Sequence, residues 1–319
     1  MKTRPLSLDT IQLEITEAGR GPLVLLVHGF PELAASWTAQ IIALSEAGYR
    51  VVAPDMRGYG SSEKPADTSS YSIHHLVGDL VALVQALGEK QAVVVGHDWG
   101  ASVAWQAALM RPDVFRAVVA LSVPFQPRRT KGPPTEVMAY MSRKAGLGDL
   151  YINRFQSPGA HLPFEADVDL SLKKLFWAFD GATIAEHQAT GFVPEGADLL
   201  DTIGSRPRLP PWLTANHFQT YVEAFSAGGF KGPFDWYRNI DRNWAETEDF
   251  QDAVIKVPAL FMVGERDPSR HYTGTQEATL ADWVVDLRGH MVVAGAGHWL
   301  QQERAETVSQ ALIGFLDSL

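Results

Sequence analysis

The sequence predicts an α/β fold, in which a mostly parallel sheet is flanked by helices on both faces. Several short segments are continuously apolar, as strands buried on both faces of a sheet are, and stretches with helical periodicity lie between them. Strands and helices that alternate in this way are typical of an α/β architecture. The 319 residues are 46% hydrophobic and 20% charged, which is enough apolar material for a substantial core.

The clearest predicted strand is the segment 23–27, because it is apolar throughout and ends at His28-Gly29. The segment 11–15 alternates apolar and polar residues instead, as a half-exposed strand does. Further buried strands are expected at 50–54, 92–95, 117–121, 259–263 and 291–294. The clearest helix covers 72–87, with one apolar stripe, Ser72 as a candidate N-cap and Gly88 beyond its end.

The alternation of strands and helices breaks between about Phe125 and Asp249. This stretch contains prolines, glycines, many aromatics and helical patterns such as 172–179, but no convincing buried strand. We therefore expect a core domain made of residues 1–124 and 249–319. Residues 125–248 would form a mostly helical domain inserted after the 117–121 strand.

Composition and charge exclude several classes of protein. The net charge of −10 argues against the broad basic surface that nucleic acid or anionic lipid would need. No apolar run approaches the ~20 residues that span a bilayer, and the N-terminal stretch lacks the apolar segment of a secretory signal, so we expect a cytoplasmic protein. The absence of cysteine removes disulfides, thiolate catalysis and cysteine-ligated metal sites.

A tight turn follows the 92–95 strand, with the sequence Gly96-His97-Asp98-Trp99-Gly100. Such a strand-to-helix turn is typical of a nucleophile elbow, which presents one side chain above the sheet. Here that side chain is the carboxylate of Asp98, which needs no deprotonation and whose charge the helix dipole favours. The alternative is that Asp98 only caps the helix. Ser102 lies inside the helix rather than at the turn, so it does not indicate a serine hydrolase.

Three motifs together resemble the α/β-hydrolases of the epoxide hydrolase and haloalkane dehalogenase branch, over nearly the whole chain. They are Leu26-Val-His28-Gly29-Phe30-Pro31, Asp55-Met-Arg57-Gly58-Tyr59-Gly60-Ser61-Ser62 and Gly96-His-Asp-Trp-Gly100. The resemblance implies an α/β-hydrolase fold with a helical cap inserted after the sixth strand. It also implies an oxyanion hole made by the backbone N–H groups of Phe30 and Trp99, although a tight turn alone would also explain the first motif. We expect Asp55 and Arg57 to be structural.

The resemblance further implies a base and an orienting acid. His298, in Gly295-Ala-Gly297-His298-Trp299, falls where the last strand of the family delivers its catalytic histidine. Neutral imidazole can take a proton from water, and a purely structural histidine is the alternative. Asp267 follows the 259–263 strand and gives the chain order nucleophile, acid, histidine that α/β-hydrolases share. Glu265 is the nearest competitor for the role of the acid.

Two tyrosines of the expected cap separate the candidate reactions. Tyr151 precedes Phe155-Gln156-Ser-Pro158-Gly159 and Tyr237 lies in Trp236-Tyr237-Arg238-Asn239, and both contexts resemble the cap tyrosines of epoxide hydrolases. A phenol can donate a proton to the oxygen of an opening epoxide. Taken singly, each tyrosine would more often be a core residue. Three other residues are expected in the wall of the substrate pocket: Pro31, Trp177 and Phe179.

The sequence thus predicts an epoxide hydrolase that needs no metal or organic cofactor. Its partners would be a small apolar epoxide and water, with neither nucleic acid nor membrane involved, and the resemblance is compatible with a homodimer. The first alternative is a haloalkane dehalogenase with the same nucleophile, but a halide donor that this family often carries as Asn after His-Gly is replaced by Phe30. The second alternative is a ligand-binding protein with a hydrolase fold and no catalysis.

Overall fold

The computed structural model describes residues 1–128, 132–184, 191–204 and 206–319. Its centre is an eight-stranded sheet with the strand order β1-β2-β4-β3-β5-β6-β9-β10. The six strands from β4 to β10 in that order are parallel, whereas β2 pairs antiparallel with both β1 and β4. The strands are β1 (Lys2–Ser7), β2 (Gln12–Ala18), β3 (Leu23–Val27), β4 (Arg50–Pro54), β5 (Ala92–His97), β6 (Phe115–Leu121), β9 (Ala259–Gly264) and β10 (Leu287–Val293).

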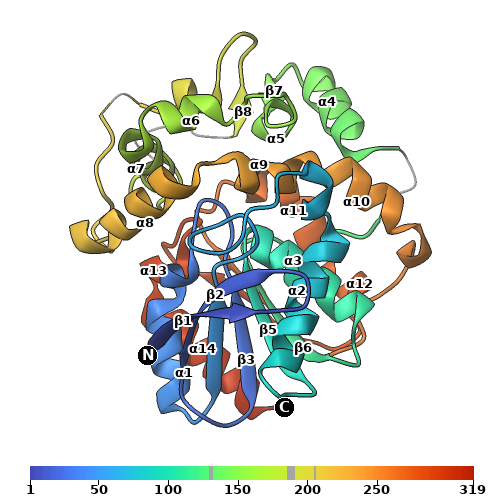
Figure 1. Ribbon diagram of the computed structural model, residues 1–319. Coiled ribbons are helices and arrows are strands. Elements are labelled where there is room, and N and C mark those ends of the chain that lie inside the picture. Colours follow the sequence, from blue (N-terminus) through green and yellow to red (C-terminus); the bar gives the residue numbers. More distant parts are fainter. Residues whose placement is uncertain (129–131, 185–190, 205) are drawn as a thin grey trace.

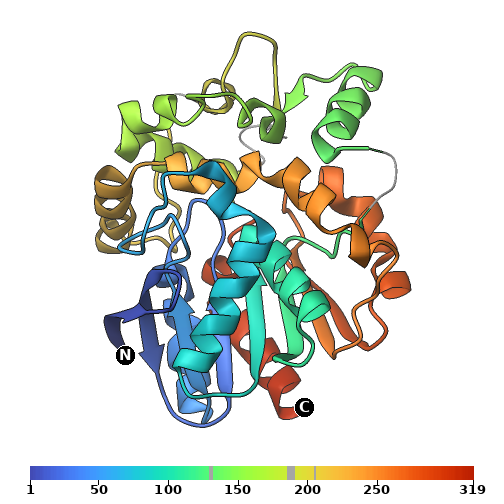
Figure 2. The same ribbon diagram turned by 45° about the vertical axis from the view of Figure 1, so that its right-hand side comes forward.

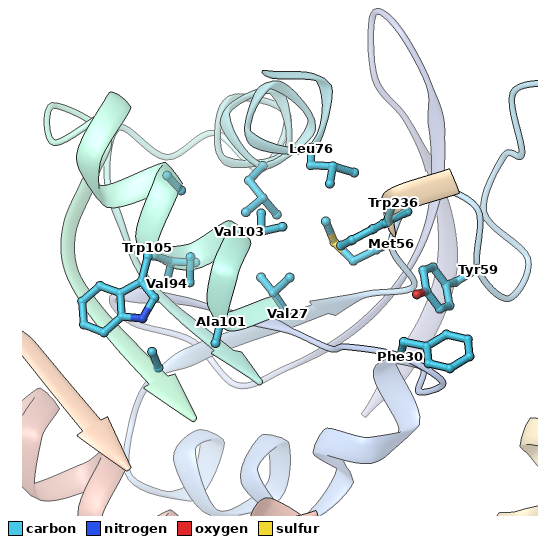
Figure 3. Close-up of a cluster of buried hydrophobic side chains, with 14 of the residues drawn as sticks. Val27, Phe30, Met56, Tyr59, Leu76, Val94, Ala101, Val103, Trp105 and Trp236 are labelled. Atoms are coloured by element: carbon cyan, nitrogen blue, oxygen red, sulfur yellow. The ribbon is translucent and has the colours of Figure 1, made fainter. Parts of the chain in front are cut away.

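Helices cover both faces of this sheet (Figure 1). Along β3, Leu25 and Val27 pack into one buried cluster with α2 and α3, and Val24 and Leu26 pack into a second cluster with α1 and α14. Figure 3 shows part of the first cluster, where Val27 and Val103 both lie. The helices of the core are α1 (Thr38–Glu46), α2 (Ile73–Ala86), α3 (Trp99–Met110), α11 (Arg270–Ala278), α12 (Leu280–Trp283), α13 (Leu300–Glu303) and α14 (Ala305–Asp317). The α/β prediction is therefore confirmed, and continuous apolar runs are strands whose two faces are both covered.

The remaining helices form a layer at one end of the sheet (Figures 1 and 2). They are α4 (Pro134–Lys144), α5 (Tyr151–Arg154), α6 (Leu162–Ala166), α7 (Val168–Ala178), α8 (Ala215–Gly228), α9 (Lys231–Arg238) and α10 (Ile240–Glu246), with a short hairpin of β7 (Asp149–Leu150) and β8 (Phe192–Val193) among them. This layer follows β6, the sixth strand. We propose residues 125–248 as the cap domain and residues 1–124 with 249–319 as the core domain. Within the described ranges, no helix combines the length and apolar character that crossing a membrane requires.

Two edge strands differ from the prediction. The sequence does not predict β1, because this strand is polar, contains Pro5 and leaves most of its side chains partly or fully exposed. At the other edge, β10 begins at Leu287, earlier than expected, because its outward side chains Arg288 and His290 interrupt the apolar pattern. Edge strands are exposed on one side, so they lack the continuous apolar run by which a buried strand is recognised in the sequence.

The helix α2 matches its predicted range, and Gly88 beyond it has the positive φ of 78° that suits glycine. Its start differs in one detail. Ser72 occupies the N-cap position, but its hydroxyl hydrogen-bonds with the ring of His75 at 3.0 Å and does not cap the helix. The amide of Ile73 instead donates to Oδ1 of Asn243, a residue of the cap domain, at 2.7 Å.

Asp55 and Arg57 fix the loops near the site, as expected for structural residues. The guanidinium of Arg57 donates twice to Asp79, at 2.8 and 2.6 Å, and both side chains are almost completely buried. Oδ1 of Asp55 accepts a hydrogen bond of 2.9 Å from the amide of Ala34. The loop after β4 is thereby joined to the loop after β3, which carries Phe30.

Candidate active site

Asp98 occupies the tight turn between β5 and α3. Its backbone has φ 53° and ψ −120°, a conformation that costs a residue with a side chain about 1–3 kcal/mol. Flanking glycines permit the turn, because a Cβ at Gly96 would lie 2.0 Å from the carbonyl oxygen of Gly100, and a Cβ at Gly100 would lie 2.1 Å from that of Val27. The side chain of Asp98 makes no capping hydrogen bond to α3. The turn therefore serves to present the carboxylate, and the helix-cap alternative does not account for it.

The two carboxylate oxygens of Asp98 have different partners. Oδ1 accepts a hydrogen bond of 2.8 Å from the amide of Phe30, and Oδ2 lies 3.4 Å from Nε2 of His298. The loop of Phe30 can come this close because Gly29 has no side chain: a Cβ there would lie 2.4 Å from Cβ of Asp98. Of the two amides expected in the oxyanion hole, the amide of Phe30 thus already contacts the carboxylate. The Trp99 amide, at the start of α3, makes no hydrogen bond to Asp98 within the described contacts.

His298 lies between the two aspartates. Its Nδ1 is 3.1 Å from both carboxylate oxygens of Asp267, which in turn accepts a hydrogen bond of 2.9 Å from the amide of Ser269. Glu265, the competitor for the acid, accepts a hydrogen bond from the amide of Gly295 instead. The structure thus brings Asp98, His298 and Asp267 together in a chain of contacts.

The charges of these three residues stabilise one another. Burial by itself raises the pKa of Asp98, but hydrogen bonding and charge from His298 outweigh it and leave that pKa below its usual value. The pKa of Asp267 is lowered in the same way, with His298 again opposing burial. Burial alone lowers the pKa of His298, whereas the two carboxylates raise it well above its usual value. The resting site therefore favours an imidazolium between two carboxylates.

A second buried histidine holds the backbone of His298. Nε2 of His97 lies 2.8 Å from the carbonyl oxygen of His298, and its Nδ1 lies 2.6 Å from Oε2 of Glu32. The ring of His97 thus joins the carboxylate of Glu32 to the backbone of the His298 loop. The other oxygen of Glu32 accepts from the side-chain amides of Gln301 and Gln302. Neither His97 nor Glu32 was predicted as a site residue from the sequence, where their place within or beside the motifs is their only signal.

Tyr151 of α5 and Tyr237 of α9 line the same cavity as Asp98 and His298. Their ring centroids are 6.0 Å apart. The ring of Tyr237 is almost completely buried and packs edge-on against Trp99, with 5.1 Å between centroids. Burial raises the pKa of both phenols above the usual value. Both therefore keep their protons at neutral pH and can donate them.

The wall of this cavity is largely apolar. Its apolar residues are Phe30, Pro31, Leu175, Phe179, Leu199, Pro268 and Trp299. Of the three residues expected in the wall, Pro31 and Phe179 belong to the described lining, whereas Trp177 does not and its ring lies against Gly204. Leu175 on α7 and Phe179, the residue that follows this helix, are four positions apart and lie toward the same side, whereas Trp177 between them lies toward the opposite side.

Comparison with known proteins agrees with this geometry. The family described as the alpha/beta hydrolase fold matches residues 22–305. Epoxide hydrolase A of Mycobacterium tuberculosis is 41% identical, with 99% of this chain and 97% of that protein covered. The chain belongs to the epoxide hydrolase family of α/β-hydrolases.

Other members of the epoxide hydrolase family are similar over the same length. Epoxide hydrolase 1 of Siraitia grosvenorii is 38% identical, over 98% of this chain and 96% of its own. The solved structure of an epoxide hydrolase from an endophytic Streptomyces has a TM-score of 0.94 at 41% identity, and 99% of this chain and 95% of that chain are covered. Epoxide hydrolase A from Mycobacterium thermoresistibile follows with a TM-score of 0.89 at 39% identity, over 99% of this chain and 98% of that chain.

The cavity also contains a third phenol that the sequence analysis missed. Tyr272 of α11 belongs to its lining. Burial raises the pKa of Tyr272 well above the usual value, and the neighbouring phenol of Tyr151 raises it further. No motif marks this position, since α11 reads as an ordinary amphipathic helix after Asp267. Its place beside Tyr151 results from the packing of α11 in the core against α5 in the cap.

Proposed function

We propose that this member of the epoxide hydrolase family converts a small apolar epoxide into a vicinal diol through a covalent ester on Asp98. One observation carries the proposal: a carboxylate on a strained turn, a histidine paired with Asp267 and two proton-bearing phenols face one apolar cavity. The carboxylate and the phenols suit ring opening, and His298 suits hydrolysis of the resulting ester.

In the first step, Oδ2 of Asp98 forms a bond to an epoxide carbon while the bond from that carbon to the ring oxygen breaks. Oδ1 is held by the Phe30 amide at 2.8 Å, so it becomes the carbonyl oxygen of the ester. The ring oxygen leaves as an alkoxide and takes a proton from Tyr151 or Tyr237. The imidazolium of His298 then gives up its proton, which restores the phenol. The pKa of His298 falls at this point, because esterification removes the negative charge of Asp98.

In the second step, neutral His298 takes a proton from water, and the water oxygen attacks the ester carbonyl carbon. The oxyanion that develops on Oδ1 receives hydrogen bonds from the amides of Phe30 and Trp99, each worth about 2.7–4 kcal/mol by precedent in serine proteases. The bond between the carbonyl carbon and Oδ2 breaks, and Oδ2, which leaves with the product, takes the proton from His298. Asp98 is left protonated and returns its proton to His298, so that the sum is epoxide plus water giving diol.

The cavity wall supports an apolar substrate, and the scheme uses only side chains and backbone amides of this chain and water. No contact in the described structure favours the haloalkane dehalogenase alternative, whereas the two phenols are superfluous for it. The catalytic residue Asp98 also argues against a ligand-binding protein, because its strained turn serves no binding purpose that an unstrained residue would not serve. A homodimer and a cytoplasmic location remain predictions.

A single-turnover reaction in H₂¹⁸O tests the proposal. With enzyme in excess over styrene oxide, the first diol should carry no ¹⁸O, because its new oxygen comes from Oδ2 of Asp98. The label should instead appear in the peptide that contains Asp98, read by mass spectrometry. Label in the diol from the first turnover would mean that water attacks the epoxide directly.

A further inference from the structure

Glu303 is a buried carboxylate that the catalytic scheme does not use. It ends the short helix α13, which begins two residues after His298, and it is 9% exposed. Its carboxylate accepts three backbone hydrogen bonds. Oε2 accepts from the amides of Gly297 and Gly181, at 2.8 and 3.0 Å, and Oε1 accepts from the amide of Trp299 at 3.0 Å.

These three amides belong to two separate parts of the chain. Gly297 and Trp299 are the direct neighbours of His298, and Gly181 belongs to the cap. A fourth hydrogen bond runs beside them, from the amide of His298 to the carbonyl oxygen of Phe179 at 2.9 Å. Phe179 lines the substrate cavity. The carboxylate of Glu303 thus joins the loop of the catalytic histidine to a cap segment that forms part of the pocket.

Close backbone packing explains why the long side chain of Glu303 joins the loop of His298 to the cap. A Cβ at Gly297 would lie 2.3 Å from the backbone nitrogen of Gly181, and a Cβ at Gly264 would lie 2.0 Å from the carbonyl oxygen of Gly297. Gly264 ends β9, the strand before Asp267. The histidine loop, the acid strand and the cap therefore meet without intervening side chains, and Glu303 supplies the acceptors from outside.

The electrostatic surroundings make these hydrogen bonds important for the carboxylate. Burial and, to a smaller extent, the nearby carboxylate of Asp180 raise the pKa of Glu303 to about 7, against hydrogen bonds from the amides of Gly297, Gly181 and Trp299 that lower it. Asp180 is itself buried and accepts from Trp212 and Thr183. The two guanidinium groups nearby donate to backbone carbonyl oxygens. That of Arg266 donates to Gly181, and that of Arg304 donates to carbonyls that include that of Glu303. In the described part of the chain no cation pairs with Glu303, so the amides are its main stabilisation.

We propose that Glu303 is a positioning residue for His298, which holds the histidine loop against the cap so that the imidazole faces both Asp98 and Asp267. This inference deepens the proposed function and rests on it. Glu303 acts through His298, and His298 serves as the base only in the second step. Loss of the Glu303 carboxylate should therefore slow hydrolysis of the ester far more than its formation.

The test compares Glu303→Gln with Glu303→Asp and with the control Glu306→Gln, an exposed position on α14 that undergoes the same change of charge. In Glu303→Gln one acceptor oxygen becomes an NH₂ group that faces an amide donor. Rapid-quench mass spectrometry with styrene oxide gives the two rates separately. We expect hydrolysis to fall on the order of 10- to 100-fold, as a misplaced catalytic group does, with ester formation within about threefold of wild type and the ester accumulating. Glu303→Asp should recover part of the loss, and Glu306→Gln should match wild type.

A second readout does not depend on turnover. In protein labelled with ¹³C and ¹⁵N in its histidines, the imidazole signal of His298 is assigned by its disappearance in His298→Gln. We expect Glu303→Gln to shift this signal and to lower the pKa of His298, because the ring loses its alignment with the two aspartates. The measurement can be made on Glu303→Asp if Glu303→Gln does not fold.

Two results would overturn the inference. One is a folded Glu303→Gln whose His298 signal and hydrolysis rate equal those of wild type. The other is an equal fall of both chemical steps together with a lower melting temperature, which would make Glu303 merely structural. Failure of wild type to form an ester with any epoxide would instead contradict the proposed function. In that case the titration of His298 alone would decide whether Glu303 positions it.

Discussion

The phenols of Tyr151 and Tyr237 offer the most informative perturbation of ring opening. Replacing either with Phe removes one hydroxyl and keeps the ring, so the packing of Tyr237 against Trp99 at 5.1 Å should persist. In the proposed scheme each hydroxyl donates a hydrogen bond to the epoxide oxygen, which becomes negatively charged as the ring opens. A hydrogen bond to a charged group contributes about 1.5–3 kcal/mol, and about 1.36 kcal/mol corresponds to a factor of ten in rate.

Each single variant should therefore form the Asp98 ester roughly 10- to 150-fold more slowly. The double variant should be slower than either single one, but the two losses should not simply multiply, because the rings are 6.0 Å apart and act on the same oxygen. Hydrolysis of the ester should change little, since the phenols act in the first step.

Ester formation is measured by rapid quench and intact mass, with Tyr140→Phe as the matched control. Tyr140 lies on α4 with 57% of its surface exposed and does not line the cavity. The control should react like wild type. A folded double variant that forms the ester at the wild-type rate would refute the role of the phenols and would remove the main argument against a haloalkane dehalogenase.

Three further predictions concern the surroundings of the site. Tyr272→Phe should slow ester formation several-fold because it removes the hydroxyl that neighbours that of Tyr151 in the cavity, and it should have no effect in a Tyr151→Phe background, as a double-mutant cycle would show. Asp79→Asn should lower the free energy of unfolding by about 3–5 kcal/mol, because it leaves the buried guanidinium of Arg57 without its partner carboxylate; urea unfolding at pH 7 measures this, and a loss below about 1 kcal/mol would contradict it. Since the folded state raises the pKa of His298, the stability that this residue contributes should be complete below its unfolded pKa of about 6.5 and should be lost as pH rises through the folded pKa; His298→Gln should remove this part of the pH dependence of unfolding.

Burial decided which parts of the fold could be predicted from the sequence. The strand β3 was predictable because both of its sides face apolar clusters, so every residue is buried. The edge strand β1 was not, because its side chains are mostly exposed. In the cap, the sequence marked α7 as a helix but not which side faces the cavity, so it could not distinguish Trp177, which is outside the described lining, from Phe179, which belongs to it.

The site was predictable where chemistry is tied to a local motif. Asp98 could be recognised because the strained turn needs its flanking glycines in the sequence itself. Tyr272 and Glu303 have no such local signature. Their significance depends on contacts between core and cap, between Tyr272 and Tyr151 and between Glu303 and Gly181. Contacts between residues so far apart in the chain leave no pattern of spacing in a single sequence.

The central claim is that the carboxylate of Asp98 forms a covalent ester that His298 then helps to hydrolyse. The most direct test is the intact mass of the His298→Gln variant after incubation with a mixture of small aryl and alkyl epoxides. We predict a gain equal to the mass of one whole epoxide, which the additional substitution Asp98→Asn abolishes. An unmodified His298→Gln protein, under conditions in which wild type converts the same epoxides to diols, would contradict the claim.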